Sequence, residues 1–238
     1  MNADFSTSLQ TLSIVFVPFV MAIVFHEYAH GWMANKFGDT TAKDQGRLTL
    51  NPLPHIDWIG TIAIPIMIIL LSSPIGFGWA KPVPISPERF TKYRKGLFWV
   101  ASAGPLMNVL LAFLFGMALV MIHVFVSDTF YLKEPFVKMA ESSVFLNFGL
   151  AFFNLIPLPP LDGAKIIQSF MDRDKAERYE ALAQYSFFII MALMMTGVFR
   201  VLSYPVVFFG SLTIQACATI IQTVVTATGM GAMLGTGL

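Results

Sequence analysis

The residues with the clearest potential for chemistry are His26, Glu27 and His30, which form a His-Glu-x-x-His pattern. In an α-helix, residues four apart lie on one face, so the two imidazoles can bind a single metal ion. Glu27 then lies beside that ion, where it can accept a proton from a metal-bound water. No charged residue stands between Asp4 and His26. A carboxylate in a membrane helix costs about 2.5–3.5 kcal/mol on insertion scales, so we expect the pattern to be functional.

Asp162 is the best candidate for a third ligand. It follows a proline-rich stretch, residues 157–160, that cannot continue a regular helix. Irregular backbone at membrane depth is tolerated where it lines a wet cavity or is covered by protein. Two histidines and one carboxylate leave a fourth tetrahedral position open, as in catalytic zinc sites. Asp162 could also cap the helix that follows it, and the two roles can coexist.

The elements that hold these residues are membrane helices. Hydrophobic residues make up 56% of the 238 residues and charged residues 12%, whereas a soluble domain carries about 25% charged residues. The composition therefore predicts an all-α, multi-pass membrane protein. A net charge of +1 gives no sign of a nucleic-acid partner. The single cysteine, Cys217, excludes an intrachain disulfide.

We expect one domain over residues 1–238, with about five to six membrane helices around a three-helix catalytic core. The core would occupy about residues 9–171, and accessory helices about residues 181–228. Uncharged runs predict the individual spans at residues 9–36, 96–127, 142–161, 181–199 and 205–228.

Residues 44–86 are expected to form a re-entrant segment with a short strand. Their densest apolar part, residues 59–71, is about 13 residues long, which is short for a span of about 20. If it re-enters, the histidines and Asp162 approach the same side, which then carries 12 of the 15 Lys and Arg residues. If it crosses, Asp162 ends on the opposite side and the basic residues divide 9 to 6. The positive-inside rule therefore favours re-entry and an active site nearer the cytosolic face.

Five segments resemble the intramembrane zinc metalloproteases of the site-2 protease type. They are FHEYAH at 25–30, NPLPHIDWIGT at 51–61, GWAKPVP at 78–84, AGPLMN at 103–108 and FFNLIPLPPLDG at 152–163. The resemblance implies a three-helix core around one zinc ion per chain. It also implies cleavage of single-span or membrane-anchored proteins within or near the bilayer. The chain resembles a compact form of the family, without a PDZ-like insertion or a nucleotide-sensing domain.

Carried over position by position, the resemblance makes His26, His30 and Asp162 the zinc ligands and Glu27 the general base. Asn154 takes the position that holds the substrate backbone or stabilises the intermediate, and Asn108 takes the polar position of its helix. Both asparagines could instead only bond neighbouring helices.

Two further histidines are open to different interpretations. His55 could bind or gate substrate, and a hydrogen bond to Asp57 is the alternative. His123, deep in an apolar span, is expected to be a packed polar residue.

We therefore expect a zinc-dependent intramembrane endopeptidase in a prokaryotic cell membrane, with its cytosolic regions carrying most basic residues. The alternative is a metal transporter or metal sensor that uses the same ligands. An inactive homologue acting as a chaperone is disfavoured by the intact motif. Association into a homo-oligomer is left open by the sequence.

Overall fold

The computed structural model describes residues 2–70, 79–197 and 199–228, and these residues form helices and turns with no strand. The all-α prediction is confirmed for this part of the chain. Four of its helices are long and apolar enough to cross a membrane, so the expected count of five to six is not confirmed. They are α1 (Asn2–Lys36), α4 (Tyr93–Phe125), α5 (Lys133–Asn154) and α9 (Phe199–Ala227).

Shorter elements connect these helices. The apolar α8 (Ala183–Met195) has 13 residues, fewer than the roughly 20 that a span needs. The others are α2 (Thr41–Asp44), the 3-10 turns η1 (Leu53–His55) and η3 (Pro87–Arg89), the π-helix η2 (Trp58–Ala63), α3 (Ile64–Leu70), α6 (Asp162–Gln168) and α7 (Arg173–Glu180).

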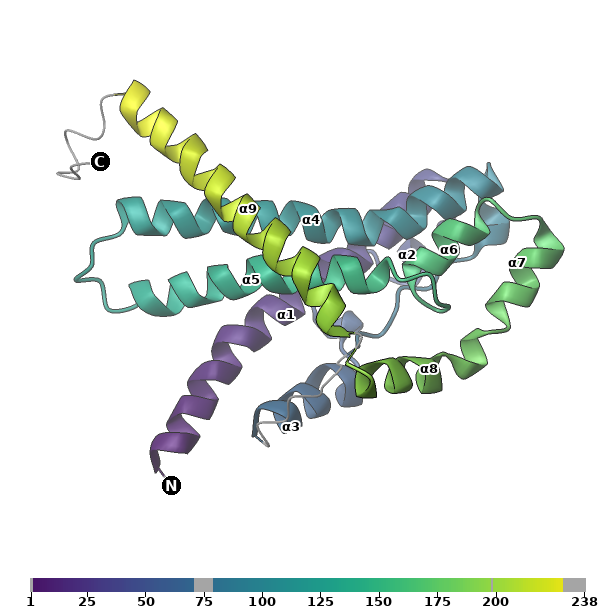
Figure 1. The fold of residues 1–238 in the computed structure, drawn as a ribbon. Helices are drawn as coiled ribbons and strands as arrows, with labels where there is room; N and C mark the ends of the chain where they lie inside the picture. The colour runs from purple at the N-terminus through teal and green to yellow at the C-terminus, as the bar shows by residue number, and fades with distance from the viewer. Residues whose placement is uncertain (1, 71–78, 198, 229–238) are drawn as a thin grey trace.

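The central helix is α4, which packs against α1, α5, α6 and α9. In Figure 1, α4 and α5 run side by side and α9 crosses them. Ala112 of α4 packs against Val144 and Phe148 of α5 in the buried core. Small residues let membrane helices approach closely, and a Cβ on Gly116 would lie only 3.2 Å from Cys217 Sγ of α9. The helices α1, α4 and α5 thus form one packed bundle.

Two predicted spans have different boundaries in the structure. The span expected at residues 142–161 is α5, which begins earlier, at a charged turn, and ends where the prolines begin. Its charged start is compatible with a helix because Glu134 and Lys138 pair at 2.6 Å, one helical turn apart. The span expected at residues 181–199 is the shorter α8. Gly197, with a φ of +72°, follows its end, as glycine commonly does where a helix stops.

The segment expected to re-enter returns to the point where it leaves the bundle. The Trp79 amide donates to the Gly60 carbonyl at 3.1 Å, and the Thr61 hydroxyl donates to the Trp79 carbonyl at 2.7 Å. Because these two ends are bonded to one another, residues 60–61 and residue 79 lie at one level of the bundle, as re-entry requires. Part of this excursion, residues 71–78, lies outside the described residues.

The short strand expected within residues 44–86 is wrong for the described residues, because residues 48–50 form bends and residue 47 has no regular structure. The Arg47 guanidinium donates to the carbonyls of Lys81 and Pro82 at 2.9 and 3.1 Å. Nearby, the Asn51 amide donates to the Thr49 hydroxyl at 3.1 Å. Side chains therefore satisfy backbone groups that a strand partner would otherwise bond.

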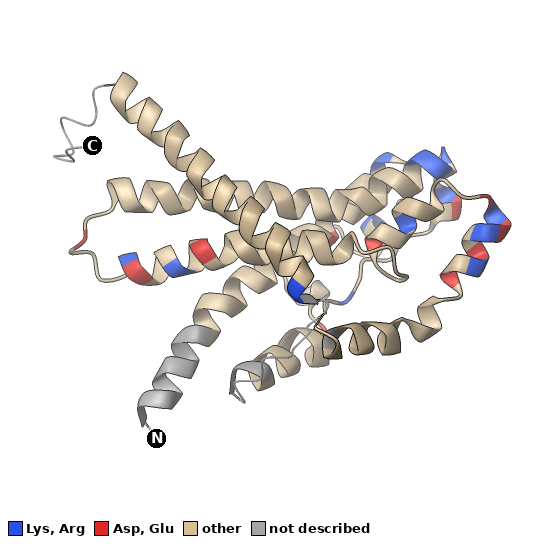
Figure 2. Cartoon of the chain, viewed as in Figure 1, with Lys and Arg blue, Asp and Glu red and all other residues tan. Residues whose placement is uncertain are grey.

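The charged residues divide the molecule into zones. Figure 2 shows Lys and Arg gathered where α4 begins and where α6 and α7 lie, with a smaller charged group at the start of α5. The helices between these zones carry almost no charge in the view. This arrangement is the one expected of a bundle whose middle is surrounded by lipid.

Candidate metal centre

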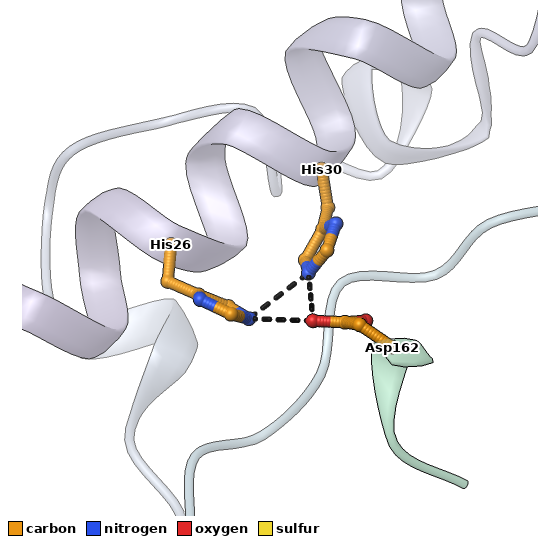
Figure 3. Close-up of side chains that lie close together, drawn as sticks. All are labelled: His26, His30 and Asp162. Atoms are coloured by element: carbon orange, nitrogen blue, oxygen red, sulfur yellow. Dashed lines mark hydrogen bonds and ion pairs between the residues drawn. The ribbon is translucent and has the colours of Figure 1, made fainter. Parts of the chain in front are cut away.

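Three ligand atoms converge at the place where α1, α4 and α6 meet. The Nε2 atoms of His26 and His30 lie 3.0 Å apart, and each lies 3.2 Å from Asp162 Oδ2 (Figure 3). The three residues are 8%, 6% and 7% exposed. The structure therefore brings together the two histidines and the carboxylate that the sequence predicts as ligands.

Local structure explains how each ligand reaches the site. His26 and His30 lie one turn apart on α1, so both rings project from the same face. Asp162 is the first residue of α6, and the residue at the N-cap position is Leu161, which makes no side-chain cap bond. The carboxylate of Asp162 thus faces the histidines, and the capping alternative does not describe its contacts.

The hydrogen bonds of the two imidazoles leave both Nε2 atoms free to bind a cation. His30 Nδ1 donates to the Val100 carbonyl at 2.7 Å, and His26 Nδ1 donates to Asn108 Oδ1 at 2.6 Å. A neutral imidazole that donates from Nδ1 carries its lone pair on Nε2. Within the described residues, Asp162 Oδ2 is buried without a hydrogen-bond donor. Three electron-pair donors facing one another in this way are stabilised by a cation between them.

The spacing of the three atoms fits zinc. At Zn–N and Zn–O distances near 2.0–2.1 Å, neighbouring ligands of a tetrahedral ion lie about 3.3 Å apart. The separations of 3.0–3.2 Å are close to that value. The same residues line a cavity of about 450 Å³ that also contains Glu27. A zinc ion held by these three residues would therefore adjoin space where a reacting group can lie.

Gly104 leaves room for this centre on the side of α4. A Cβ placed on Gly104 would lie 2.6 Å from His26 Nε2 and closer still to His30 Nε2. No side chain larger than hydrogen can stand there without displacing the two ligands. The quoted motif at 103–108 contains this glycine, but its role depends on a distance between helices that the sequence does not specify.

Glu27 is held in the cavity by the backbone of the extended segment at residues 79–86. Its Oε2 accepts a hydrogen bond from the Val83 amide at 2.7 Å. Pro82 and Pro84 flank Val83 and have no amide hydrogen, and proline also restricts the preceding residue to extended conformations. The Pro-Val-Pro triplet therefore presents a single donor, and that donor binds Glu27.

The segment at residues 79–86 is anchored at several points. Its Lys81 amide donates to the His55 carbonyl at 2.9 Å, and Arg47 binds two of its carbonyls. At its far end, the Ser86 amide donates to Asp39 Oδ2 at 2.7 Å. Burial raises the pKa of the Asp39 carboxyl, but hydrogen bonds from Thr41 and Ser86 outweigh burial and hold that pKa below its ordinary value.

Two asparagines form a buried chain of hydrogen bonds behind His26. Asn108 lies on α4 and bonds Asn147 of α5, with 2.9 Å between Nδ2 and Oδ1. Sequence reasoning missed Asn147. A signal was present, because Asn147 lies seven residues before Asn154 and two helical turns place both on the same face.

The structure places the remaining predicted residues apart from the three ligands. Asn154 lines the cavity, and its amide donates to the Leu150 carbonyl at 3.0 Å. His55 is buried, and its Nε2 bonds the Thr49 carbonyl at 2.9 Å. Asp57 instead accepts from the amides at the start of η2, so the expected His55–Asp57 bond is wrong.

His55 is not among the described residues that line the cavity. Its predicted role in binding or gating therefore has no contact to support it. His123 lies in the last turn of α4 and is exposed, so the expectation of a packed residue deep in the span is wrong; its Nδ1 bonds the Leu119 carbonyl one turn earlier at 3.0 Å.

Comparisons with known proteins agree with this site. The model of peptidase family M50 matches residues 14–196. "Putative zinc metalloprotease YwhC" of Bacillus subtilis (strain 168) is 35% identical over 198 residues, covering 83% of this chain and 87% of that protein. "Putative zinc metalloprotease Rip2" of Mycolicibacterium smegmatis is 27% identical over 187 residues, covering 77% of this chain and 67% of that protein. No solved structure matches the chain.

Proposed function

The chain belongs to peptidase family M50 and is a zinc metalloprotease, and we propose that it cleaves membrane-protein substrates in or near their membrane segments. The observation that carries this proposal is the convergence of His26, His30 and Asp162 in one buried cavity with Glu27. A centre of three protein ligands with an open fourth position is typical of catalysis, whereas structural zinc sites are closed by four protein ligands.

Zinc and the residues of the chain would supply different parts of the reaction. When bound, zinc supplies Lewis acidity, which polarises a carbonyl and makes water a nucleophile near neutral pH. Glu27 Oε2 accepts the Val83 amide, which leaves Oε1 to take the proton of the attacking water. The same carboxyl then delivers this proton to the leaving amine. Val83 thus keeps the base oriented while the proton moves.

The cavity supports a substrate that is partly exposed to water. It runs from the metal ligands to charged residues of α6 and α7, including Lys165, Arg173 and Glu177. These residues lie in the charged zone of Figure 2, so water and a polar segment can reach the ligands from that end. A substrate helix must unwind locally, because its carbonyls are otherwise bonded within the helix. Asn154, at the cavity wall, is the proposed side chain that binds the unwound backbone.

We also propose an orientation in the membrane. The charged zone formed by the start of α4, by α6 and α7 and by the loops at residues 36–57 and 79–92 contains most of the basic residues, and the positive-inside rule assigns such a zone to the cytosol. The substrates would then be single-span or membrane-anchored proteins cut near their cytosolic side. The bonded ends of the re-entrant segment support this arrangement, because they keep the ligands and the basic loops at one end of the bundle.

The decisive experiment compares the wild-type protein with Glu27→Gln. Glutamine can still accept the Val83 amide but cannot take a proton at neutral pH, so the variant is expected to keep zinc and lose cleavage. Proteomics of membranes that contain either form would identify single-span proteins that persist uncut with Glu27→Gln. Purified protein with such a substrate then measures the cleavage rate directly.

Two results would contradict the proposal. One is cleavage at the wild-type rate by Glu27→Gln, and the other is zinc uptake into proteoliposomes that does not depend on Glu27. The second result would favour a metal transporter that uses the same ligands. A transporter needs ligands that bind and release the ion, and it has no need for a base held next to an open position.

A further inference from the structure

A chain of three polar side chains connects α5 to the metal centre through α4. Asn147 of α5 bonds Asn108 of α4, which bonds His26 of α1. Asn108 and Asn147 are fully buried, at 0% exposure, among the apolar residues of the bundle core. Ligand geometry at the metal is therefore linked to a helix that contributes no metal ligand.

We propose that Asn147 is a positioning residue for zinc: acting through Asn108, it keeps the His26 ring in the tautomer that directs an electron pair at the metal. This role rests on the metal centre and not on the choice of substrate. Zinc affinity therefore tests it separately from the proposed cleavage reaction.

The orientation of each amide follows from main-chain carbonyls, which can only accept. Asn147 Nδ2 donates to the Ser143 carbonyl at 2.8 Å, so Asn147 Oδ1 is the atom that faces Asn108. Asn108 Nδ2 donates to that oxygen at 2.9 Å and to the Ala22 carbonyl at 3.3 Å. Asn108 Oδ1 is then the atom left facing His26, and it accepts from Nδ1 at 2.6 Å.

The reverse orientation of Asn108 would damage the metal centre. A flipped amide presents its NH₂ group to His26 Nδ1, which must then carry the lone pair and leave the hydrogen on Nε2. That hydrogen would point into the space between the three ligands. Asn147 opposes the flip because its Oδ1 needs a donor, and leaving a buried acceptor without one is unfavourable. The Ala22 carbonyl opposes the flip less strongly, since its bond is longer.

The first test replaces Asn147 with leucine and with aspartate. Asn147→Leu removes the acceptor that fixes Asn108, and loss of a residue that supports a metal ligand typically weakens metal binding about 10–100-fold. A zinc Kd raised about tenfold or more is expected, measured against a competing chelator in detergent. Asn147→Asp keeps an oxygen that faces Asn108, and its protonated oxygen can still donate to the Ser143 carbonyl, so it should bind zinc within about threefold of wild type. The visible spectrum of the cobalt-substituted protein should change in the leucine variant and not in the aspartate variant.

The second test asks whether Asn147 acts through Asn108. Ionised aspartate at position 108 can only accept, whichever oxygen faces His26, so it cannot turn a donor toward the ring. In an Asn108→Asp background, Asn147→Leu should therefore leave the zinc Kd unchanged, although it raises the Kd in the wild-type background. Such a double-mutant cycle isolates the coupling between the two residues. Asn147→Ser, whose hydroxyl is too short to bond Asn108, repeats the comparison if Asn147→Leu does not fold.

A purely structural role predicts different results. Hydrogen bonds between helices stabilise membrane proteins, so a purely structural role predicts that each Asn147 variant lowers the thermal midpoint of the metal-free protein and leaves the zinc Kd unchanged. Cys217→Ala, at the α4–α9 contact, is the control for loss of packing without a change in zinc affinity. The proposal is overturned if Asn147→Leu binds zinc with the wild-type Kd. Equal losses from Asn147→Leu in both backgrounds would also overturn it.

Discussion

The two histidine ligands and Glu27 come from the same two turns of α1, yet different parts of the molecule hold them. The histidines are fixed by side-chain and carbonyl contacts inside the helix bundle, to Asn108 and Val100. Glu27 is fixed by the amide of Val83, in an extended segment that other loops anchor. Ligand positions thus depend on helix packing, and the position of the base depends on loop anchoring. Variants of the helix bundle should therefore change zinc affinity, and variants of the loops should change the cleavage rate without changing zinc affinity.

The largest effect is expected where α4 meets the ligands. Gly104→Ala places a methyl group less than 3.0 Å from both ligating Nε2 atoms. Either the helices move apart or the ligands turn away, so zinc affinity should fall by more than about 100-fold. Zinc content after dialysis against a buffered metal solution measures this loss.

Gly149→Ala is the matched control, because its Cβ would meet no described atom within 4 Å. The control should retain zinc, and its thermal midpoint should stay close to that of wild type. If Gly104→Ala bound zinc as tightly as Gly149→Ala, the close approach of α4 to the ligands would be disproved.

The next largest effect is expected from a variant that displaces Glu27 and leaves the metal ligands in place. Arg47→Met removes the two hydrogen bonds that hold the carbonyls of Lys81 and Pro82. The segment that carries Val83 then loosens, and a small displacement of a catalytic group can cost up to about 100-fold in rate. We expect kcat/KM to fall about 10–100-fold while the zinc Kd stays at its wild-type value.

Lys43→Gln is the control for the loss of one positive charge on the same loop, since Lys43 is exposed. It should cleave at nearly the wild-type rate. A parallel fall in zinc affinity and kcat/KM in Arg47→Met would mean that the two regions are not separate.

A smaller effect is expected on the pH dependence of stability. It arises at Asp39, which binds the Ser86 end of the segment at residues 79–86. The pKa of Asp39 is held below its ordinary value by hydrogen bonds to its ionised form. A depressed folded-state pKa gives stability that is present above the unfolded-state pKa, near 3.9, and is lost as the pH falls through the lower folded value. At neutral pH, Asp39→Asn should be about 2 kcal/mol less stable than wild type, because bonds to a charged acceptor are weakened.

This stability difference should shrink as the pH drops below about 4, where the Asp39 carboxyl of the unfolded chain takes up a proton, and should vanish once the pH falls below the lower pKa of the folded state. Thermal unfolding in detergent from pH 7 to pH 3 measures it. A difference that stays constant over this range would show that the Asp39 charge does not anchor Ser86.

The smallest effect is expected at the contact between α4 and α9. Gly116→Ala would place a methyl group 3.2 Å from Cys217 Sγ and from a Thr213 methyl group, a distance that a slight helix shift can relieve. We expect a loss of about 1 kcal/mol or less in stability and no change in zinc Kd. A large loss of zinc would mean that α9 helps to position the ligands.

The metal ligands could be predicted from the sequence because their arrangement follows from helical spacing or from a recognisable motif. His26 and His30 share a face through helical spacing alone, and Asp162 follows a proline break that leaves its backbone irregular. The all-α class followed from composition. These features need no knowledge of how the helices pack.

The groups that support the ligands could not be predicted in the same way. Gly104 and Asn147 matter because of distances between helices, and Val83 matters because a loop folds back onto α1. The boundaries of α5 were misplaced for a related reason. An apolar run marks the part of a helix in lipid, and α5 continues past it through charged residues.

The Pro-Val-Pro triplet has a further consequence for observing the enzyme. Its two prolines carry no exchangeable backbone hydrogen, so Val83 supplies the triplet's single signal in a deuterium-exchange experiment. That hydrogen is the one bonded to Glu27. Its exchange rate therefore reports how firmly the carboxylate is held, and a ligand that draws Glu27 away should expose this one amide to solvent.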